Sequence, residues 1–127
     1  MGLTKHYYDD KCNNFISVMK EFGDWKHAEQ LEVQVMEKRK KVLGAKHPYT
    51  LISMGNLAKT YADQGKLNEA EHLEVQVLGM RKKVLGREHL DTLISMGNLA
   101  RTYADQGKLN EAEHLQVQVL DMRKVLN

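Results

Sequence analysis

The sequence predicts an all-α protein built as a stack of helical hairpins, and two observations support this prediction. First, the stretch Leu51–Lys82 recurs as Leu93–Lys124 with only three substitutions, so the chain has an internal period of 42 residues. A period between about 20 and 50 residues is typical of stacked-repeat architectures. Second, apolar residues within each copy recur at spacings of three and four, which indicates amphipathic helices.

The first helix of the middle copy is expected to begin at Pro48 and to stop at Gly65. Proline is well tolerated at the first helical position because the N–H group that it lacks would have no partner there. Glycine is common just after a helix ends. The apolar stripe that should face the core consists of Leu51, Met54, Leu57, Ala58 and Tyr61.

The second helix is expected to begin near Asn68, a good capping residue, and to end at Gly86. Residues 73–77 alternate between apolar and polar, as a strand would. We favour a helix because the three-and-four spacing continues on both sides and no turn residues bracket the segment. The expected core stripe consists of Ala70, Leu73, Val77 and Val84.

A weaker first copy emerges when 42 residues are subtracted from the positions of the middle copy. By this register Phe15 takes the place of Leu57, and Cys12 takes the place of Met54 as a small core residue. Polar neighbours are more frequent here, which suits a terminal repeat whose outer face has no neighbour. We therefore predict a single domain, residues 1–127, with repeats at approximately 7–44, 48–86 and 90–127.

Composition restricts the class of protein. The chain has 127 residues, of which 42% are hydrophobic and 28% charged, with a net charge of +2, values that fit a folded soluble domain. A single cysteine excludes an intrachain disulfide and agrees with a reducing compartment. No apolar run approaches the roughly 20 residues that span a bilayer. We expect a cytoplasmic protein that does not contact the membrane.

Several recurring residues resemble the tetratricopeptide repeat, in which a small residue, a tyrosine and a turn glycine hold a helical hairpin together. They are Leu57, Ala58, Tyr61, Gly65 and Ala70, repeated as Leu99, Ala100, Tyr103, Gly107 and Ala112. The long period and the linker Val42, Leu43, Gly44, His47, Pro48, Thr50 and Leu51 are most similar to the kinesin light chain variety, and to arrays in fungal nucleotide-binding receptor proteins. The resemblance covers residues 9–127 and implies a right-handed superhelical solenoid of about three repeats.

Three positions depart from that family pattern. Leu90 replaces the linker proline in the third copy, and the sequence stops at Asn127 without the capping helix that such arrays commonly carry. Glu32, Glu74 and Gln116 stand where many relatives have an aromatic residue on the second helix.

The resemblance implies a non-catalytic scaffold that binds a peptide in a concave groove lined by the first helix of each repeat. A helical wheel places one set of residues opposite the buried stripe: Asn14, Ser17, Ile52, Asn56, Lys59, Asp63, Ile94, Asn98, Arg101 and Asp105. An asparagine amide can donate to and accept from an extended peptide, and the cations would attract acidic side chains. We predict an acidic or aromatic-and-acidic peptide as ligand. The alternative is that these residues form an ordinary solvated surface.

The third repeat suggests a second function, that of a self-assembly module. It repeats the internal sequence of the middle copy but has no successor in this sequence, so Leu99, Tyr103 and Val119 are expected to be partly exposed. Exposed apolar patches tend to find partners. We therefore also consider stacking of repeats between chains to form a homo-oligomer; a fragment whose missing repeats cover this surface is the alternative.

Other signals carry less weight. The basic runs 38–41 and 81–83 could bind phosphate or nucleic acid, but positive charge near helix C-termini is explained by the helix dipole, which disfavours a nucleic-acid function. The recurring histidines, His47 with His89 and His72 with His114, lack the companions that a metal site needs. No nucleophile motif, paired carboxylates or phosphate-binding loop is present, so neither an enzyme nor a cofactor is expected.

One arginine in each copy falls on the apolar stripe of its second helix: Arg39, Arg81 and Arg123. Its aliphatic stem can pack while the head reaches water, or the head can pair with an acid such as Glu74. The sequence leaves both interpretations open.

Overall fold

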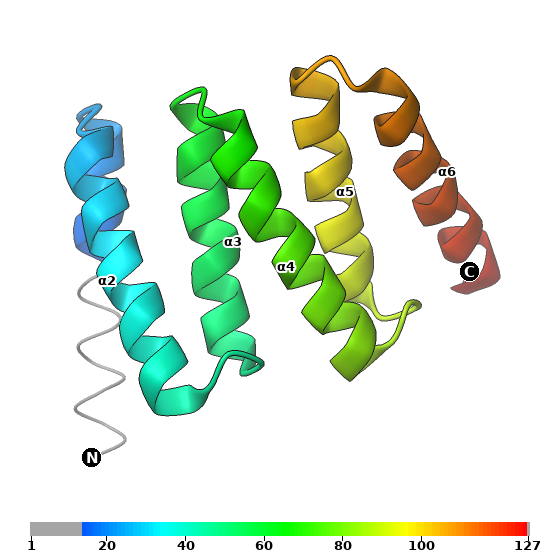
Figure 1. The fold of residues 1–127 in the computed structure, drawn as a ribbon, viewed down its shortest axis with the longest axis horizontal. Coiled ribbons are helices and arrows are strands. Elements are labelled where there is room, and N and C mark those ends of the chain that lie inside the picture. The colour runs from blue at the N-terminus through cyan, green and yellow to red at the C-terminus, as the bar shows by residue number, and fades with distance from the viewer. Residues whose placement is uncertain (1–13, 127) are drawn as a thin grey trace. The chain divides into compact units, whose positions relative to one another are not determined.

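The fold is all-α, as predicted. The computed structural model describes residues 14–126, and this part of the chain contains helices and no strand. After a helical stretch at residues 14–21, the helices run in the order α2 (Trp25–Leu43), α3 (Pro48–Asp63), α4 (Leu67–Leu85), α5 (Leu90–Asp105) and α6 (Leu109–Leu126) (Figure 1). Short turns join them. None of the described helices is long and apolar enough to cross a bilayer.

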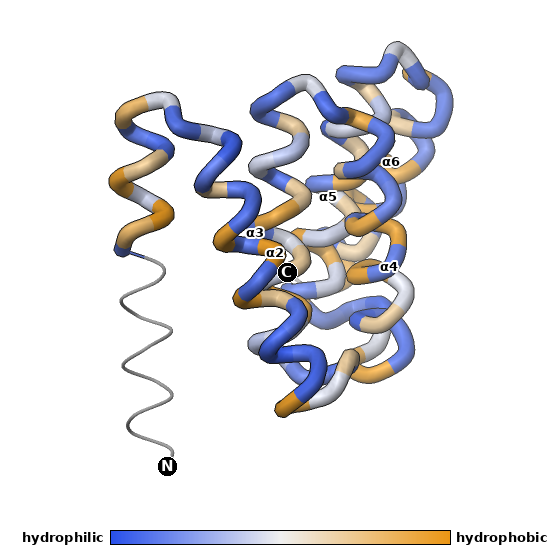
Figure 2. Tube along the Cα trace, turned by 60° about the vertical axis from the view of Figure 1, so that its left-hand side comes forward, coloured by the Kyte–Doolittle hydropathy of each residue, from blue (hydrophilic) through white to orange (hydrophobic). Residues whose placement is uncertain are grey.

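The chain divides into two compact units at the junction of Thr60 and Tyr61, within α3. The first unit contains residues 14–21, α2 and most of α3, and the second contains the end of α3 with α4, α5 and α6. In the second unit α5 packs against both α4 and α6. Hydrophobic and hydrophilic residues are interspersed along every helix, as expected for helices buried on one side (Figure 2).

Local sequence signals set most helix boundaries. α3 begins at Pro48, and Gly65 lies in the turn after α3 with a φ of 80°. α4 ends before Gly86, which has a φ of 94° and donates its N–H to the carbonyls of Arg81 and Lys82. Residues 73–77 lie inside α4, so the helical interpretation of this alternating segment is confirmed.

The prediction that Asn68 caps α4 is wrong. The helix begins one residue earlier, because the Lys66 carbonyl accepts the first helical hydrogen bond from Ala70 N–H over 3.1 Å, and Lys66 has no side-chain cap bond. The Asn68 side chain instead accepts from Gln106 Nε2 over 3.1 Å. Asn68 therefore ties the start of α4 to the residue that follows α5.

The core of the second unit lies between its three full helices. Four buried side chains form its centre, and four half-buried ones pack against them: Leu78, Leu93, Met96 and Leu99, with Tyr103, Leu115, Val119 and Met122. Two expected core positions are wrong. Val84 is 53% exposed because α4 turns Leu78 toward α5 instead, and in the first unit Phe15 is 64% exposed while Ile16 beside it is buried. Cys12 lies outside the described residues.

Candidate protein-interaction site

The first helix of the third repeat carries one exposed strip. On α5, Ile94, Asn98, Arg101 and Asp105 are exposed, and their spacings of four, three and four residues keep them on one side of the helix. Buried residues of the same helix alternate with them: Thr92, Leu93, Ser95, Met96, Leu99, Ala100 and Thr102. An apolar side chain, an amide, a cation and a carboxylate thus face solvent in that order along α5.

The same chemistry recurs on α3. Ile52, Asn56 and Lys59 are exposed in the first unit, and Asp63 is exposed at the end of the helix. The isoleucines are 44% and 47% exposed at residues 52 and 94, so each strip includes an apolar side chain in contact with water. Asn14 and Ser17, the weaker counterparts in the first copy, are also exposed.

An arginine and a serine join α4 to the buried side of α5. Arg81 Nη1 donates to Ser95 Oγ over 2.7 Å and to the Asp91 carbonyl over 3.2 Å. The first unit has the same arrangement, in which Arg39 Nη1 donates to Ser53 Oγ over 2.7 Å and to the Tyr49 carbonyl over 3.0 Å. Because these bonds hold α5 and α3 by their buried faces, the strips on the opposite faces stay exposed.

A glutamate and a threonine make a second link on the same side. Thr102 Oγ1 donates to Glu74 Oε1 over 2.5 Å, and in the first unit Thr60 Oγ1 donates to Glu32 Oε1. Burial raises the pKa of Glu74 to about 7, against the hydrogen bond from Thr102 and the charge of Arg101, which lower it. Glu74 thus contacts a threonine and does not form the ion pair with Arg81 that the sequence left open. Sequence reasoning missed the serine and threonine partners, although both recur among the apolar positions of the first helices.

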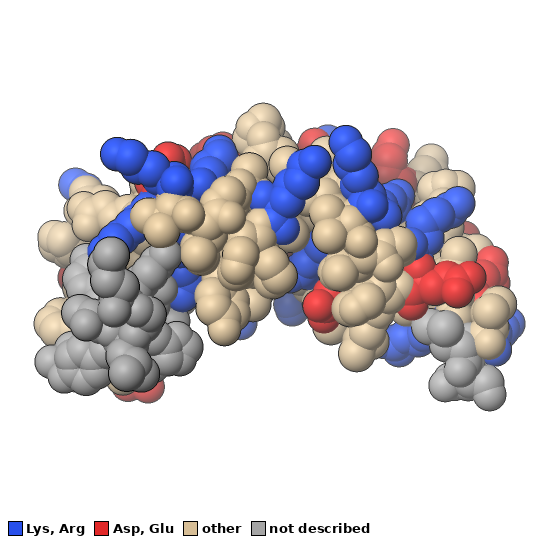
Figure 3. Space-filling model, turned by 90° about the horizontal axis from the view of Figure 1, so that it is seen from below, with Lys and Arg blue, Asp and Glu red and all other residues tan. Residues whose placement is uncertain are grey.

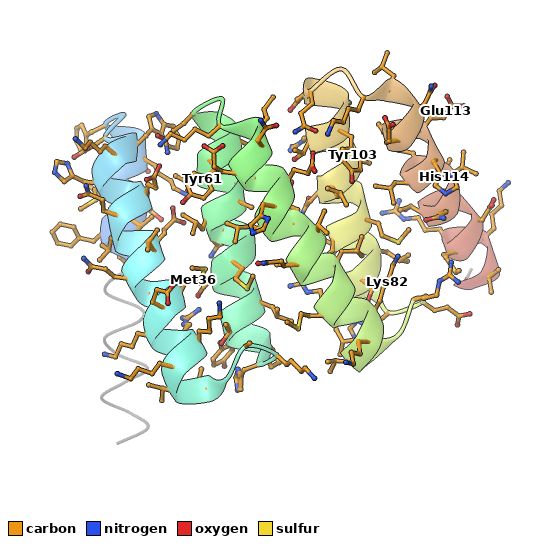
Figure 4. The ribbon with its side chains drawn as sticks, viewed as in Figure 1. Met36, Tyr61, Lys82, Tyr103, Glu113 and His114 are labelled. Atoms are coloured by element: carbon orange, nitrogen blue, oxygen red, sulfur yellow. The ribbon has the colours of Figure 1, made fainter. Side chains whose placement is uncertain are left out.

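Of the three apolar residues predicted to be partly exposed and to support self-association, one is less exposed than expected. Leu99 is only 4% exposed, which corrects the prediction for this residue, because Leu115 and Val119 of α6 pack against the core to which Leu99 belongs. Tyr103 and Val119 are half-buried. Tyr103 lies near the end of α5 (Figure 4), where Lys108 Nζ stands 5.5 Å from the centre of its ring.

The recurring histidines have local roles. His89 caps α5, accepting the Asp91 N–H at Nδ1 over 3.0 Å, and His47 accepts the Tyr49 N–H over 3.1 Å at the start of α3. His114 lies on α6 (Figure 4), and its Nε2 is 3.1 Å from Nε2 of Gln118. Within residues 14–126 no group of three histidine, cysteine or acidic side chains is placed to hold a metal ion.

The basic runs lie at the ends of the second helices. Lys82 and Lys83 occupy the last turn of α4, and Lys40 and Lys41 occupy that of α2. Figure 3 looks onto these helix ends and shows lysine and arginine side chains there. Positive charge at a helix C-terminus interacts favourably with the helix dipole, and this effect explains the basic runs without the need for a bound phosphate or nucleic acid.

Comparison with known proteins agrees with this architecture. The sequence pattern of the tetratricopeptide repeat matches residues 17–49, 50–91 and 92–127. A comparison with curated proteins gave no match. Repeats of this family generally mediate protein–protein interaction.

Solved structures show the same fold. Two crystal structures of nearly identical TPR-like repeats from a Podosopora anserina protein, described as a kinesin light chain, superpose with TM-scores of 0.83 and 0.82 at 31% identity. They match 91% of this chain but only 54% and 55% of theirs, so this chain spans about half their length. BtubC (BKLC) from P. vanneervenii has a TM-score of 0.81 at 19% identity, over 91% of this chain and 46% of its own. The resemblance to kinesin light chain repeats is confirmed, and the chain belongs to the tetratricopeptide repeat family.

Proposed function

We propose that the chain is a non-catalytic interaction module, and that the exposed strip on the first helix of a repeat, present on α3 and again on α5, binds an extended segment of a partner protein. The observation that carries the proposal is the recurrence of one exposed set, Ile-x3-Asn-x2-(Lys/Arg)-x3-Asp, on both helices while the opposite faces are buried. Each strip combines an apolar side chain with an amide, a cation and a carboxylate, groups that can together contact the side chains and the backbone of a partner segment.

The strip has complementary chemistry for an extended chain. The amide of Asn98 can donate to a backbone carbonyl and accept from a backbone N–H of the ligand. Ile94 offers an apolar contact, and Arg101 offers a guanidinium fork that suits a carboxylate. The ligand expected from this order is a segment with an apolar or aromatic residue close to an acidic one.

The test is an amide-resolved NMR titration with a peptide array in which acidic and aromatic residues are varied independently. Shifts are expected at Asn56, Lys59, Asn98 and Arg101. Asn98→Ala and Arg101→Glu should each weaken binding by about tenfold, the effect of losing roughly 1.4 kcal/mol. Gln118→Ala on α6 is the matched control and should leave the affinity unchanged.

Charge reversal sharpens this experiment. A peptide with lysine in place of its acidic residue should bind the Arg101→Glu variant better than it binds the natural chain. The proposal would be contradicted if the amide resonance shifts were confined to α4 and α6, or if the affinity did not depend on the charge of the peptide.

A second candidate, self-association, is favoured by one contrast between equivalent residues. Leu78 on α4 is 6% exposed beneath α5, whereas Leu120 on α6 is 57% exposed. An apolar residue in this position can be covered by another chain. Light scattering up to millimolar concentration should show association that Leu120→Lys abolishes, and an array should then select peptides of the chain's own sequence. A monomer throughout that range would reject this candidate.

A further inference from the structure

The two units contain equivalent glutamates, of which Glu32 is buried and Glu74 is half-buried, and their surroundings differ. In the first unit Glu32 is 5% exposed, accepts the Thr60 hydroxyl at Oε1, and has Lys20 Nζ 3.4 Å from Oε2. Each carboxylate oxygen therefore faces a donor, and one of the donors is a cation. This is the arrangement in which a buried carboxylate can stay ionised.

In the second unit Glu74 keeps the threonine but lacks the cation. Thr102 Oγ1 donates to its Oε1 over 2.5 Å, as Thr60 does to Glu32. The 42-residue period, however, places Ala62 where the first unit has Lys20. No lysine or arginine among the described residues forms an ion pair with Glu74.

The charges around Glu74 do not replace that cation. On its own helix Glu71 lies close enough to disfavour a second negative charge, and Lys108, the nearest cation to Glu71, is bonded to it over 2.8 Å. Arg101 on α5 attracts the carboxylate but makes no hydrogen bond with it. In the third copy Gln116 occupies the same position and cannot ionise.

We propose that the contact of Glu74 with Thr102 is a pH-responsive joint, in which the protonated acid holds α5 against α4 and ionisation loosens the α5–α6 hairpin. The geometry supports this because Glu74 lies half-buried between α4 and α5 without an ion pair to any described residue. The hydroxyl of Thr102 favours the ionised carboxylate, but the cost of charging a half-buried group is the larger effect, so ionisation opposes the packing of the two helices. The inference does not depend on the proposed peptide binding.

The direction of the effect follows from proton linkage. Burial raises the pKa of Glu74 from 4.5 to about 7, so the folded state holds this proton over a range in which the unfolded chain has lost it. The stabilisation is therefore fully present below about pH 4.5 and is lost as the pH rises through about 7. Physiological pH lies at the upper end of this window.

The test compares the natural chain with Glu74→Gln, which installs the residue that the third copy already carries. The measurement is amide hydrogen exchange in α5, corrected for intrinsic exchange rates. Between pH 5 and pH 8 the protection factors of α5 should fall about tenfold more in the natural chain than in the variant. This value is smaller than the full linkage effect because Glu74 is only partly buried. The difference between the two chains isolates the contribution of Glu74 from that of every other titratable group. Glu88→Gln, at an exposed glutamate, is the matched control.

Two further measurements keep the proposal falsifiable if one variant folds poorly. Ala62→Lys should supply the missing cation and flatten the pH dependence, as Lys20 is placed to do for Glu32. The carboxyl carbon of Glu74, followed by NMR, should titrate near pH 7. A midpoint near 4.5, or equal pH dependence of the natural chain and Glu74→Gln, would overturn the proposal.

Discussion

Arg81 donates from Nη1 to Ser95 Oγ over 2.7 Å, and Arg39 makes the same bond to Ser53 at the same distance. Each arginine also donates to a backbone carbonyl in the first turn of the helix that carries its serine. On α4 the arginine of the apolar stripe is thus accommodated by a hydroxyl and a carbonyl of the adjoining helix, and not by Glu74.

Replacing Arg81 with methionine should lower the free energy of unfolding by about 1.5–3 kcal/mol, the range for hydrogen bonds to a charged group. The substitution removes Nη1, which donates both hydrogen bonds, and leaves Ser95 Oγ buried without that donor. Arg123→Met is the matched control: Arg123 occupies the equivalent place on α6 but is exposed, so the loss should stay within about 0.5 kcal/mol. Urea unfolding measures both, and equal effects would show that the Arg81 bonds are not what stabilises the chain.

Two equivalent threonines should respond oppositely to removal of the hydroxyl. Thr92 Oγ1 donates to the Gly86 carbonyl over 2.8 Å, whereas the buried Thr50 Oγ1 has no partner among the described residues. Thr50→Val should therefore raise stability by up to about 1 kcal/mol, and Thr92→Val should lower it by about 1 kcal/mol. Thermal unfolding of the two variants decides; a loss of stability in both would mean that the Thr50 hydroxyl is satisfied after all.

Two glycines of the α4 region should also respond oppositely to alanine. Gly79 lies inside α4, and a methyl group there would meet nothing within 4 Å, so Gly79→Ala should stabilise the chain by about 0.5–1 kcal/mol. Gly86 has φ 94° and ψ 161°, a conformation open essentially to glycine alone, so Gly86→Ala should destabilise it by about 1–3 kcal/mol. Denaturant unfolding measures both changes as shifts in the midpoint at an unchanged m-value. If Gly86→Ala were as stable as the natural chain, the linker would have to adopt another conformation.

The histidine cap of α5 gives a fourth prediction. His89→Ala removes the acceptor for the Asp91 N–H and should lower stability by about 0.5–2 kcal/mol, whereas His89→Asn keeps a capping acceptor and should recover most of the loss. His114→Ala, at an exposed position on α6, is the control and should change stability by no more than about 0.5 kcal/mol. An equal loss of stability in His89→Ala and His89→Asn would show that the imidazole contributes by something other than capping.

Helix positions were predictable because their signals are local. Pro48 begins α3, Gly86 follows the end of α4, and the three-and-four spacing outweighed the strand-like alternation of residues 73–77. The start of α4 was predicted wrongly because the Asn68 side chain accepts a hydrogen bond from Gln106 and does not cap its own helix. The local sequence around Asn68 does not indicate a contact with a residue so far along the chain. The exposed strip of α5 was also predictable, since it is the remainder of a periodic buried face.

The periodic sequence by itself determined that the chain is helical, where α3 and α4 meet their turns, and which side of α5 remains in water, because backbone preferences and helical periodicity act over a few residues. Only tertiary structure decided that Leu99 is covered, that Arg81 bonds to Ser95, and that Glu74 is half-buried without an ion pair within residues 14–126. Those outcomes depend on which helix packs against which residue, and nearly identical stretches of sequence meet different neighbours in successive repeats.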